Sequence, residues 1–298
     1  MTAVAPNSNP ALQALLELLE MERIEVNLFR AQNGPSQHVF GGQVLGQAIV
    51  AASRTVEDRH LHSIHGYFLR RGDASTPILF DVDRIRDGSS FTTRRVVGIQ
   101  HGQAIFNMSS SFQRAEKGLE HQGEMPDVPP PEELQSDRGF YRERAKVDPG
   151  VERYSFRYEA IESRQVEGLH MVPRQRREAH EPRKHTWMRT RGALPEDPVV
   201  HGSFLAYMSD MDFMSTSMLP HGPELASYTI QGATLDHAMW FHRPFRADEW
   251  LLFSKESPSA AGSRGFVRGH FFDREGRLVA STTQECLIRL RERRVDVP

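Results

Sequence analysis

Three polar residues in the second half of this 298-residue chain stand inside otherwise apolar patterns. Asp210 lies between two methionines, Thr234 opens an aromatic-rich segment, and Gln284 lies in an alternating run near the C-terminus. A carboxylate with a reference pKa of about 3.9 is ionised at neutral pH and can accept a proton. A hydroxyl and an amide do not titrate there, but they can hold a water molecule by hydrogen bonds from both sides. Together the three residue types predict a site at which Asp210 activates a water that Thr234 and Gln284 position.

Each of these residues also has a simpler interpretation, and the pattern alone leaves both open. Asp210 can be solvated, threonine is common in strands, and Gln284 can lie on an exposed strand face. The signatures of serine nucleophiles, phosphate-binding loops, zinc helices and dinucleotide folds are absent from the sequence. A hydrolase with this sequence would therefore have to activate water without a serine nucleophile. Asp212, two residues beyond Asp210 and turned away on the same predicted helix, is expected to play no part.

The 14 histidines include two closely spaced pairs, His62 with His65 and His237 with His242, for which a metal site is conceivable. Both pairs fall in predicted strands without a third ligand at a usual spacing, which favours surface or hydrogen-bonded core histidines. The single cysteine, Cys286, excludes an internal disulfide and every multi-cysteine metal motif. This usage suits a reducing compartment, and Cys286 is expected to be a small apolar residue of the last strand.

The chain carries 37 Lys and Arg against 39 Asp and Glu, a formal net charge of −2. No basic block is interleaved with aromatic residues, so the charge pattern predicts no nucleic-acid partner. No apolar run approaches the ~18 residues of a membrane span, and the first apolar segment is typical of an amphipathic helix rather than a signal peptide. The last residues form no peroxisomal or reticulum-retention address, so a cytoplasmic protein is expected.

The periodicity of apolar residues predicts the same order of elements twice. In the first half, a helix over residues 40–52 precedes β-rich segments at 63–69, 78–85, 92–99 and 104–112. In the second half, a short strand at 187–189 and a helix over 201–214 precede segments at 233–242, 250–256, 265–272 and 278–289. A helix followed by an antiparallel meander, twice, is an α+β plan in which each sheet curls around one central helix. This arrangement is a double hotdog.

Residues 88–113 and 262–287 follow one plan, in which two β-like segments flank a glycine-containing turn. An offset of 174 residues aligns Gly88 with Gly262, Ser89 with Ser263, Arg94 with Arg268, Gly102 with Gly276, and Ser110 with Gln284. The two copies therefore differ at the candidate site, which suggests that one half kept a single site and the other lost it.

These patterns divide the chain into an N-terminal hotdog repeat over residues 1–115, an inter-repeat connection over 116–184 and a C-terminal hotdog repeat over 185–298. The connection is rich in Pro, Glu, Arg and Gln, and is expected to be partly ordered by its aromatic residues, which include Phe140, Tyr141, Tyr154, Phe156 and Tyr158. Its arginine run at 174–177 is expected on a solvated face, although an anionic ligand could use it.

Four blocks of sequence closely resemble the acyl-CoA thioesterase II family. They begin at Phe40 (FGGQVLGQA), His65 (HGYFLR), Leu235 (LDHAMWFHRPF) and Arg264 (RGFVRG). The resemblance extends in order from about Leu12 to about residue 289 and is weakest in 116–184. Blocks in a fixed order are far more specific than any single block. The resemblance implies the family's double hotdog fold.

The resemblance also implies a catalytic trio at matching positions. Asp210 ends the segment YMSD, Thr234 precedes the Asp-His pair of TLDH, and Gln284 lies in STTQE of the last strand. In the family these residues hydrolyse an acyl-CoA thioester to CoA and a carboxylic acid by direct attack of an activated water. No metal or organic cofactor is implied.

Two other functions remain open at this point. A hotdog enoyl-CoA hydratase or dehydratase would use an Asp and His pair, but Asp236 and His237 are adjacent, and neighbours on a strand point to opposite faces. A non-catalytic acyl-CoA binding protein would not need an intact Asp, Thr and Gln set. Both observations favour the thioesterase.

An acyl-CoA substrate makes two demands on the protein. Its acyl chain needs an apolar channel, for which Phe204, Met208 and Met211, with Phe213 and Met214, are candidates unless they belong to the core. Its phosphates need cations, for which Arg243, Arg264, Arg268 or the arginine-rich connection are candidates. Because hotdog sheets often pair edge to edge and back to back, a homo-oligomer is expected, either a dimer of double hotdogs or a tetramer.

Overall fold

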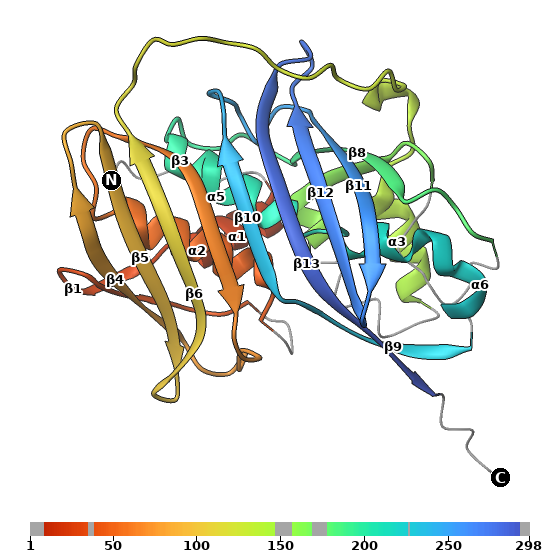
Figure 1. The fold of residues 1–298 in the computed structure, drawn as a ribbon, viewed down its shortest axis with the longest axis horizontal. Coiled ribbons are helices and arrows are strands. Elements are labelled where there is room, and N and C mark those ends of the chain that lie inside the picture. The colour runs from red at the N-terminus through yellow and green to blue at the C-terminus, as the bar shows by residue number, and fades with distance from the viewer. Residues whose placement is uncertain (1–8, 35–38, 147–156, 169–177, 226, 293–298) are drawn as a thin grey trace.

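The computed structural model describes residues 9–34, 39–146, 157–168, 178–225 and 227–292. Its strands form one antiparallel sheet, in the order β1-β2-β4-β5-β6-β3-β10-β13-β12-β11-β8-β7, with β9 paired to β13 (Figure 1). The helical elements are α1 (Pro10–Leu19), α2 (Gly41–Ser53), α3 (Asp137–Ala145), α5 (Pro198–Ser209), α6 (Gly222–Leu225) and the 3-10 helices η1 (Pro131–Glu133) and η3 (Met214–His221). The strands of the first half are β1 (Glu22–Glu25), β2 (Leu28–Ala31), β3 (His60–Phe68), β4 (Ile78–Asp87), β5 (Phe91–Gln100) and β6 (Gln103–Gln113). The remaining strands are β7 (Ile161–Gln165), β8 (Arg183–Thr190), β9 (Tyr228–Thr234), β10 (Asp236–Phe241), β11 (Leu251–Ala261), β12 (Arg264–Phe272) and β13 (Leu278–Glu292).

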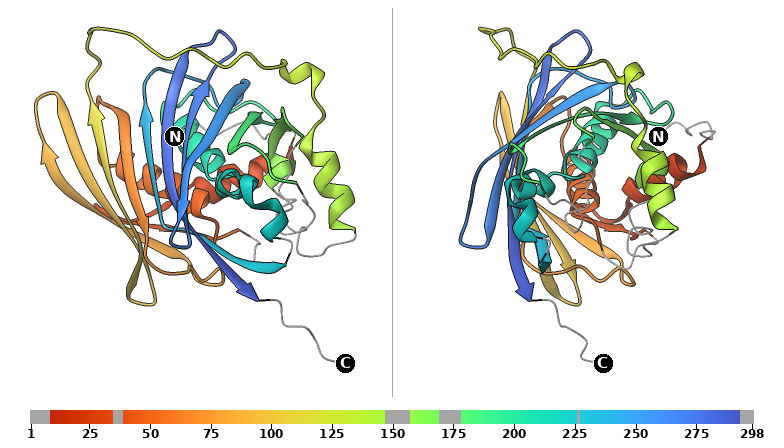
Figure 2. Two further views of the ribbon diagram at one scale, coloured as in Figure 1. Left: turned by 45° about the vertical axis from the view of Figure 1, so that its right-hand side comes forward. Right: turned by 90° about the vertical axis from the view of Figure 1, so that its right-hand side faces the viewer.

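The sheet is built from two copies of one strand order. Reading outward from the centre, β3-β6-β5-β4 in the first half corresponds to β10-β13-β12-β11 in the second. The copies join where β3 and β10 run antiparallel, with Ile64 opposite Met239. Figure 2 shows the sheet curving around α2 and α5, with α1 and α3 on the far side of this helix pair. The predicted double hotdog is confirmed.

The two central helices pack antiparallel at very short range because α2 carries glycines where they meet. A Cβ added at Gly42 would lie 2.5 Å from the Tyr207 carbonyl oxygen, and one at Gly46 would lie 3.0 Å from that of Ser203. A helix that is buried on all sides needs no polar face, and every residue of α5 from His201 to Ser209 is buried. The antiparallel arrangement brings the N-terminus of α2 to the C-terminal end of α5.

The repeat alignment needs one correction. Ser110 lies opposite Arg94 on β5, whereas Gln284 lies opposite Val267 on β12. The predicted match of Arg94 with Arg268 is therefore one residue out of register, because the hairpin turn that precedes the strand is longer in the first half. A shift of one residue along a strand places a side chain on the opposite face of the sheet, so Arg94 is buried and Arg268 is exposed.

The predicted strand over 233–242 is two strands with a bulge between them. Thr234 on β9 pairs with Cys286, whereas Ala238 on β10 pairs with Thr283, so β9 and β10 together contain one residue more than the facing stretch of β13. Such a bulge bends the strand and turns a side chain to a new direction. The bulge lies at Leu235, beside Thr234.

Other differences from the sequence prediction lie at the margins of the sheet. The hairpin of β1 and β2 was not predicted, since its strands are short and β1 is exposed at every residue. The second helix ends at Ser209 rather than 214, and η3 follows.

Residues 116–184, the inter-repeat connection, contain η1, α3, β7 and the start of β8, and the rings of Tyr141 and Tyr158 stack with centroids 4.0 Å apart. The arginine run at 174–177, Tyr154 and Phe156 lie outside the described residues. Within the described ranges, no helix is long and apolar enough to cross a membrane.

Candidate active site

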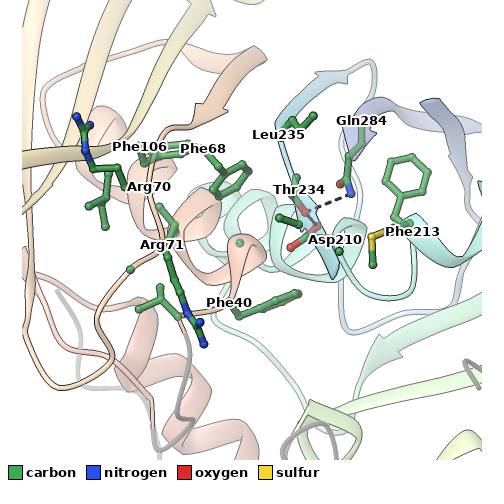
Figure 3. Close-up of a pocket in the computed structure, with 18 of the residues that line it drawn as sticks. Phe40, Phe68, Arg70, Arg71, Phe106, Asp210, Phe213, Thr234, Leu235 and Gln284 are labelled. Atoms are coloured by element: carbon green, nitrogen blue, oxygen red, sulfur yellow. Dashed lines mark hydrogen bonds between the residues drawn. The ribbon is translucent and has the colours of Figure 1, made fainter. Parts of the chain in front are cut away.

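A cavity of about 720 Å³ opens where the two central helices meet β3, β9 and β13. Asp210, Thr234 and Gln284 line it together, although the first and the last are 74 positions apart in the sequence. Figure 3 shows the three side chains pointing toward one another, with the hydrogen bond from Gln284 to Thr234 marked. The rest of the described lining is mostly apolar and includes Val39, Phe40, Val44, Phe68, Leu69, Ile105, Phe106, Phe213 and Met214.

Asp210 is the C-cap residue of α5 and faces the first turn of α2. Its Oδ2 accepts a hydrogen bond of 2.8 Å from the backbone N–H of Gly42, and its Oδ1 accepts one of 3.1 Å from the Thr234 hydroxyl. The Gly42 N–H is one of the amides that a helix leaves unpaired at its N-terminus, where the helix dipole favours a negative charge. A Cβ at Gly41 would lie 2.7 Å from Asp210 Oδ2, so this approach requires glycine.

The pKa of the Asp210 carboxyl is raised from 3.8 to about 6, because burial penalises its charged form. The Arg157 guanidinium and the hydrogen bonds from Thr234 and Gly42 lower the pKa and offset part of this effect. A carboxyl with a pKa near 6 is mostly ionised at neutral pH and is a stronger base than an ordinary aspartate. The environment is therefore suited to proton transfer.

Arg157 was missed from the sequence. Its guanidinium lies 3.5 Å from the centroid of the Phe40 ring, and Arg157 lines the cavity. It belongs to the inter-repeat connection, where the abundance of arginine gave no reason to single out one residue. Its role depends on the folding of that connection back over the helix pair.

Gln284 is buried in β13 and bonded at both ends of its amide. Its Nε2 donates to Thr234 Oγ1 at 3.3 Å, and its Oε1 lies 2.8 Å from Nδ1 of His237. His237 is fully buried, and burial lowers its pKa to about 4, so the ring is neutral at physiological pH. Its Nε2 lies 2.9 Å from both Ser209 Oγ and Thr282 Oγ1. His237 is thus a hydrogen-bonded core histidine.

The other histidines singled out in the sequence also have partners that are not metal ligands. His62 bonds Ser111, His242 bonds Ser281, and the His65 ring packs edge-on against Trp240. Among the side chains that the structure describes, no group of three or more His, Cys, Asp or Glu is placed to hold a metal ion.

The candidates for the acyl channel divide into two groups. Phe204 and Met208 on α5, and Met211 just beyond its end, are buried in the core and are not part of the cavity lining. Phe213 and Met214 come after α5 ends and do line the cavity. Beside α5, apolar lining is therefore supplied by the segment that follows the helix rather than by the helix itself.

Arg243, Arg264 and Arg268, the arginines predicted to hold the CoA phosphates, are not among the described residues that line this cavity. Arg264 donates to Glu285 at 2.8 Å, Arg268 pairs with Glu256, and Arg243 donates to the Leu278 carbonyl oxygen at 2.9 Å. Among the described residues that line the cavity, three are cations: Arg70 and Arg71, two and three residues beyond the end of β3, and Arg157. Figure 3 shows Arg70 and Arg71 on the side of the cavity opposite Gln284.

Asp212, which was expected to be turned away from the site and to play no part, is among the residues that line the cavity. It lies beyond the end of α5 with a φ of 58° and forms an ion pair with Lys184, which is fully buried. Burial would raise the pKa of Asp212, but Lys184 and Lys255 outweigh that effect and hold its pKa below the usual value. Asp212 is therefore a buried structural anion and not a neutral control position.

Comparisons with known proteins agree along almost the whole chain. A family model described as "Acyl-CoA thioesterase" matches residues 164–287, and one described as "Acyl-CoA thioesterase N-terminal domain" matches residues 30–113. The chain is 41% identical to acyl-coenzyme A thioesterase 8 of Mus musculus, covering 92% of this chain and 88% of that protein. It is 37% identical to acyl-CoA thioesterase 2 of Haemophilus influenzae, covering 94% of this chain and 99% of that protein. The crystal structure of an acyl-CoA thioesterase II from Mycobacterium marinum superposes with a TM-score of 0.77 at 42% identity, covering 93% of this chain and 98% of that one.

Proposed function

The chain belongs to the acyl-CoA thioesterase II family of thioester hydrolases, and from that premise we propose that it cleaves fatty acyl-CoA with a water activated by Asp210. Asp210 takes a proton from the water while the water oxygen bonds to the thioester carbonyl carbon. The carbon–sulfur bond then breaks, and the proton held by Asp210 passes to the departing sulfur. The products are a carboxylic acid and the thiol of CoA, with all atoms of the water accounted for.

The observation that carries this proposal is the hydrogen-bonded carboxylate in the cavity. Asp210 has a pKa of about 6, and its two oxygens are held by the Gly42 N–H and the Thr234 hydroxyl. Gln284 supplies an amide donor beside the same hydroxyl. A water bound among these groups would be oriented by neutral side chains and deprotonated by the one carboxylate among them.

The cavity also supports the substrate class. Its aromatic and aliphatic wall can bury an acyl chain, as ligand pockets of this size commonly do. Arg70 and Arg71 can pair with phosphate oxygens of CoA on the opposite side of the cavity. We therefore propose these two arginines for the phosphates. Arg243, Arg264 and Arg268 are not among the described residues that line this cavity.

The discriminating experiment is to incubate the protein separately with palmitoyl-CoA and crotonyl-CoA. Release of free thiol from palmitoyl-CoA supports the thioesterase, and loss of the enoyl absorbance of crotonyl-CoA without thiol release would support a hydratase. Binding without either reaction would identify a non-catalytic acyl-CoA binding protein. Asp236 counts against the hydratase, because its Oδ1 accepts the Glu285 N–H at 2.7 Å and it is not part of the cavity lining.

Three further properties stay predictions. We propose the division into repeats at 1–115 and 185–298 with a connection at 116–184, a homo-oligomer, and a cytoplasmic location. Limited proteolysis, light scattering of the purified protein and fractionation of cells would test them in turn. Acyl-chain preference is to be read from thiol release across a series of chain lengths.

A further inference from the structure

We infer that His237 is a positioning residue, which fixes the orientation of the Gln284 amide and thereby the direction of the hydrogen bonds that end on Asp210. The inference rests on the proposed function, because it concerns how the proposed base and its partners are held. His237 is not among the residues that line the cavity, so it acts through Gln284 rather than on the substrate.

The hydrogen bonds that link His237, Gln284, Thr234 and Asp210 have a direction, and the Asp210 carboxylate determines it. The Thr234 hydroxyl lies within hydrogen-bond distance of Asp210 Oδ1 at 3.1 Å and of the Gln284 amide at 3.3 Å. A hydroxyl has one hydrogen, and a bond to an ionised carboxylate is roughly twice as strong as a bond to a neutral amide oxygen. Thr234 therefore donates to Asp210 and accepts from Gln284. Gln284 must present its NH₂ group to Thr234.

This orientation determines the state of the histidine. With its NH₂ group toward Thr234, Gln284 turns its Oε1 to Nδ1 of His237, and an amide oxygen can only accept. Nδ1 must therefore carry the ring proton. In a neutral ring Nε2 is then an acceptor, and the hydroxyls of Ser209 and Thr282 both lie 2.9 Å away. Each hydroxyl also reaches a backbone carbonyl, that of Ala206 at 2.8 Å or of Ala238 at 2.9 Å, so one of the two must turn its single hydrogen from the carbonyl to Nε2. The bonds run in one direction, from His237 through Gln284 and Thr234 to Asp210.

Without the N–H donor of the His237 imidazole, the Gln284 amide would no longer be held in this one orientation. A reversed Gln284 amide would offer Thr234 an oxygen, which competes with Asp210 for the single hydroxyl hydrogen. Asp210 would then lose a bond that lowers its pKa, while the Gly42 N–H and Arg157 would remain. Among the described residues, Tyr207 on its own helix and Cys286 on β13 also interact electrostatically with Asp210, and Asp212, paired with Lys184, lines the same cavity. The side chains that bond to the His237 ring are instead Gln284, Ser209 and Thr282. The acid limb of activity would move to higher pH.

The experiment compares His237→Leu, which has no donor, with His237→Asn, whose amide can place an N–H near the position of Nδ1. The Leu variant is expected to lower kcat roughly 10- to 100-fold with KM changed less than about threefold, as the loss of one buried hydrogen bond predicts. Its acid limb in kcat/KM should lie above that of wild type. The Asn variant should recover most of kcat and the wild-type acid limb, a rescue that filling a hole in the core would not produce.

Asp210→Asn is assayed beside them to separate the two proposals. If Asp210→Asn turns over like wild type, the proposed function fails. If Asp210→Asn is inactive but His237→Leu keeps the wild-type kcat and acid limb, the inference about His237 is wrong and the thioesterase proposal stands. If the Leu variant does not fold, nitrogen NMR of the wild-type histidines at pH 8 decides. A proton on Nδ1 of His237 supports the inference, and a proton on Nε2 overturns it.

Discussion

The two halves of the molecule place different residues at one position of the same sheet. In the second half, Gln284 lies beside His237 on the neighbouring strand and opposite Val267. In the first half, Ser110 lies between Ile64 and Arg94. The helix ends differ as well, since α5 has Asp210 at its C-cap and α2 has an arginine there. One architecture therefore holds the candidate site at this position in one half and a filled interior at the same position in the other.

Arg94 is the group that fills the first half. It is only 1% exposed, and its guanidinium donates to Thr55 Oγ1 at 2.8 Å, to the Thr55 carbonyl at 3.0 Å and to Asp87 at 2.6 Å. A buried cation with its donors satisfied leaves neither space nor a free partner for a ligand. The loss of a site in one half would therefore involve more than one polar side chain, because the emptied volume must be occupied.

The first half still contributes to the remaining site. Gly42 at the N-terminus of α2 holds the Asp210 carboxylate, and Phe40, Phe68 and Arg70 line the cavity. The proposed chemistry comes from the second half and much of its binding surface from the first. We therefore expect the two halves to be active only together.

Among substitutions that distinguish the two halves, we expect the largest effect on kcat from removal of the proposed base, Asp210. Asp210→Asn should lower kcat by roughly 10²- to 10⁴-fold, the usual contribution of a positioned general base. In the wild type, kcat/KM should rise with pH through about 6 and then level off, since the pKa of Asp210 is raised to about 6. The exposed Asp81→Asn in the first half is the control and should keep wild-type kinetics. Wild-type turnover in Asp210→Asn would exclude this residue as the base.

The same substitution has a predicted effect on stability with a defined sign. A carboxyl whose folded pKa is above its unfolded value contributes stability that is fully present below the unfolded pKa and is lost as pH rises through the folded pKa. For Asp210 that interval runs from 3.8 to about 6. Asp210→Asn should therefore be more stable than wild type at pH 8, by on the order of 2–3 kcal/mol. Denaturant unfolding at pH 8 and pH 4 measures this, and an advantage that does not shrink at pH 4 would contradict it.

The sequence predicted the repeated fold well, because alternation along strands and small residues on the central helix are local patterns. It also named the three side chains that meet in the cavity. It did not predict Arg157, His237 as a partner of Gln284, or the buried role of Asp212. Each of these depends on a contact between distant segments, namely the return of the connection over Phe40, the register of β10 against β13, and an ion pair with Lys184. Local periodicity carries no information about such contacts.

The water-holding residues give the next largest expected effect. Gln284→Glu should reduce turnover at pH 8 at least as much as Gln284→Ala, because a carboxylate offers only acceptors and adds a negative charge near Asp210. Thr234→Val, which removes the hydroxyl donor, should also lower kcat. The deficit of Gln284→Glu, measured against wild type at each pH, should shrink toward pH 5 as the new carboxyl takes up a proton. If Gln284→Glu and Thr234→Val both match wild type at every pH, the proposed roles are wrong.

A smaller effect, on stability alone, is expected from the residue that fills the first half. Arg94→Met keeps the length of the chain but removes its donors, and should cost about 2–4 kcal/mol of unfolding free energy. The kcat of the folded protein should stay within about twofold of wild type. Arg268→Met is the matched control, because this exposed residue pairs only with Glu256 near the surface and should cost less than about 0.5 kcal/mol. Equal losses for the two variants would contradict the structural role of Arg94.

The smallest expected effect belongs to Ser110, the counterpart of Gln284. Its hydroxyl donates only a long bond of 3.4 Å to the Arg94 carbonyl oxygen, so Ser110→Ala should leave kcat and KM within about twofold of wild type. Ser110→Gln should likewise create no second site, because Arg94 occupies the space and no acid stands at the end of α2. Titration of Ser110→Ala and of wild type with a non-hydrolysable thioether analogue of palmitoyl-CoA should give one productive site per chain in both. Two catalytically equal sites per chain, or a loss of turnover in Ser110→Ala comparable with that of Gln284→Ala, would show that the first half had not lost its site and that the two halves act alike.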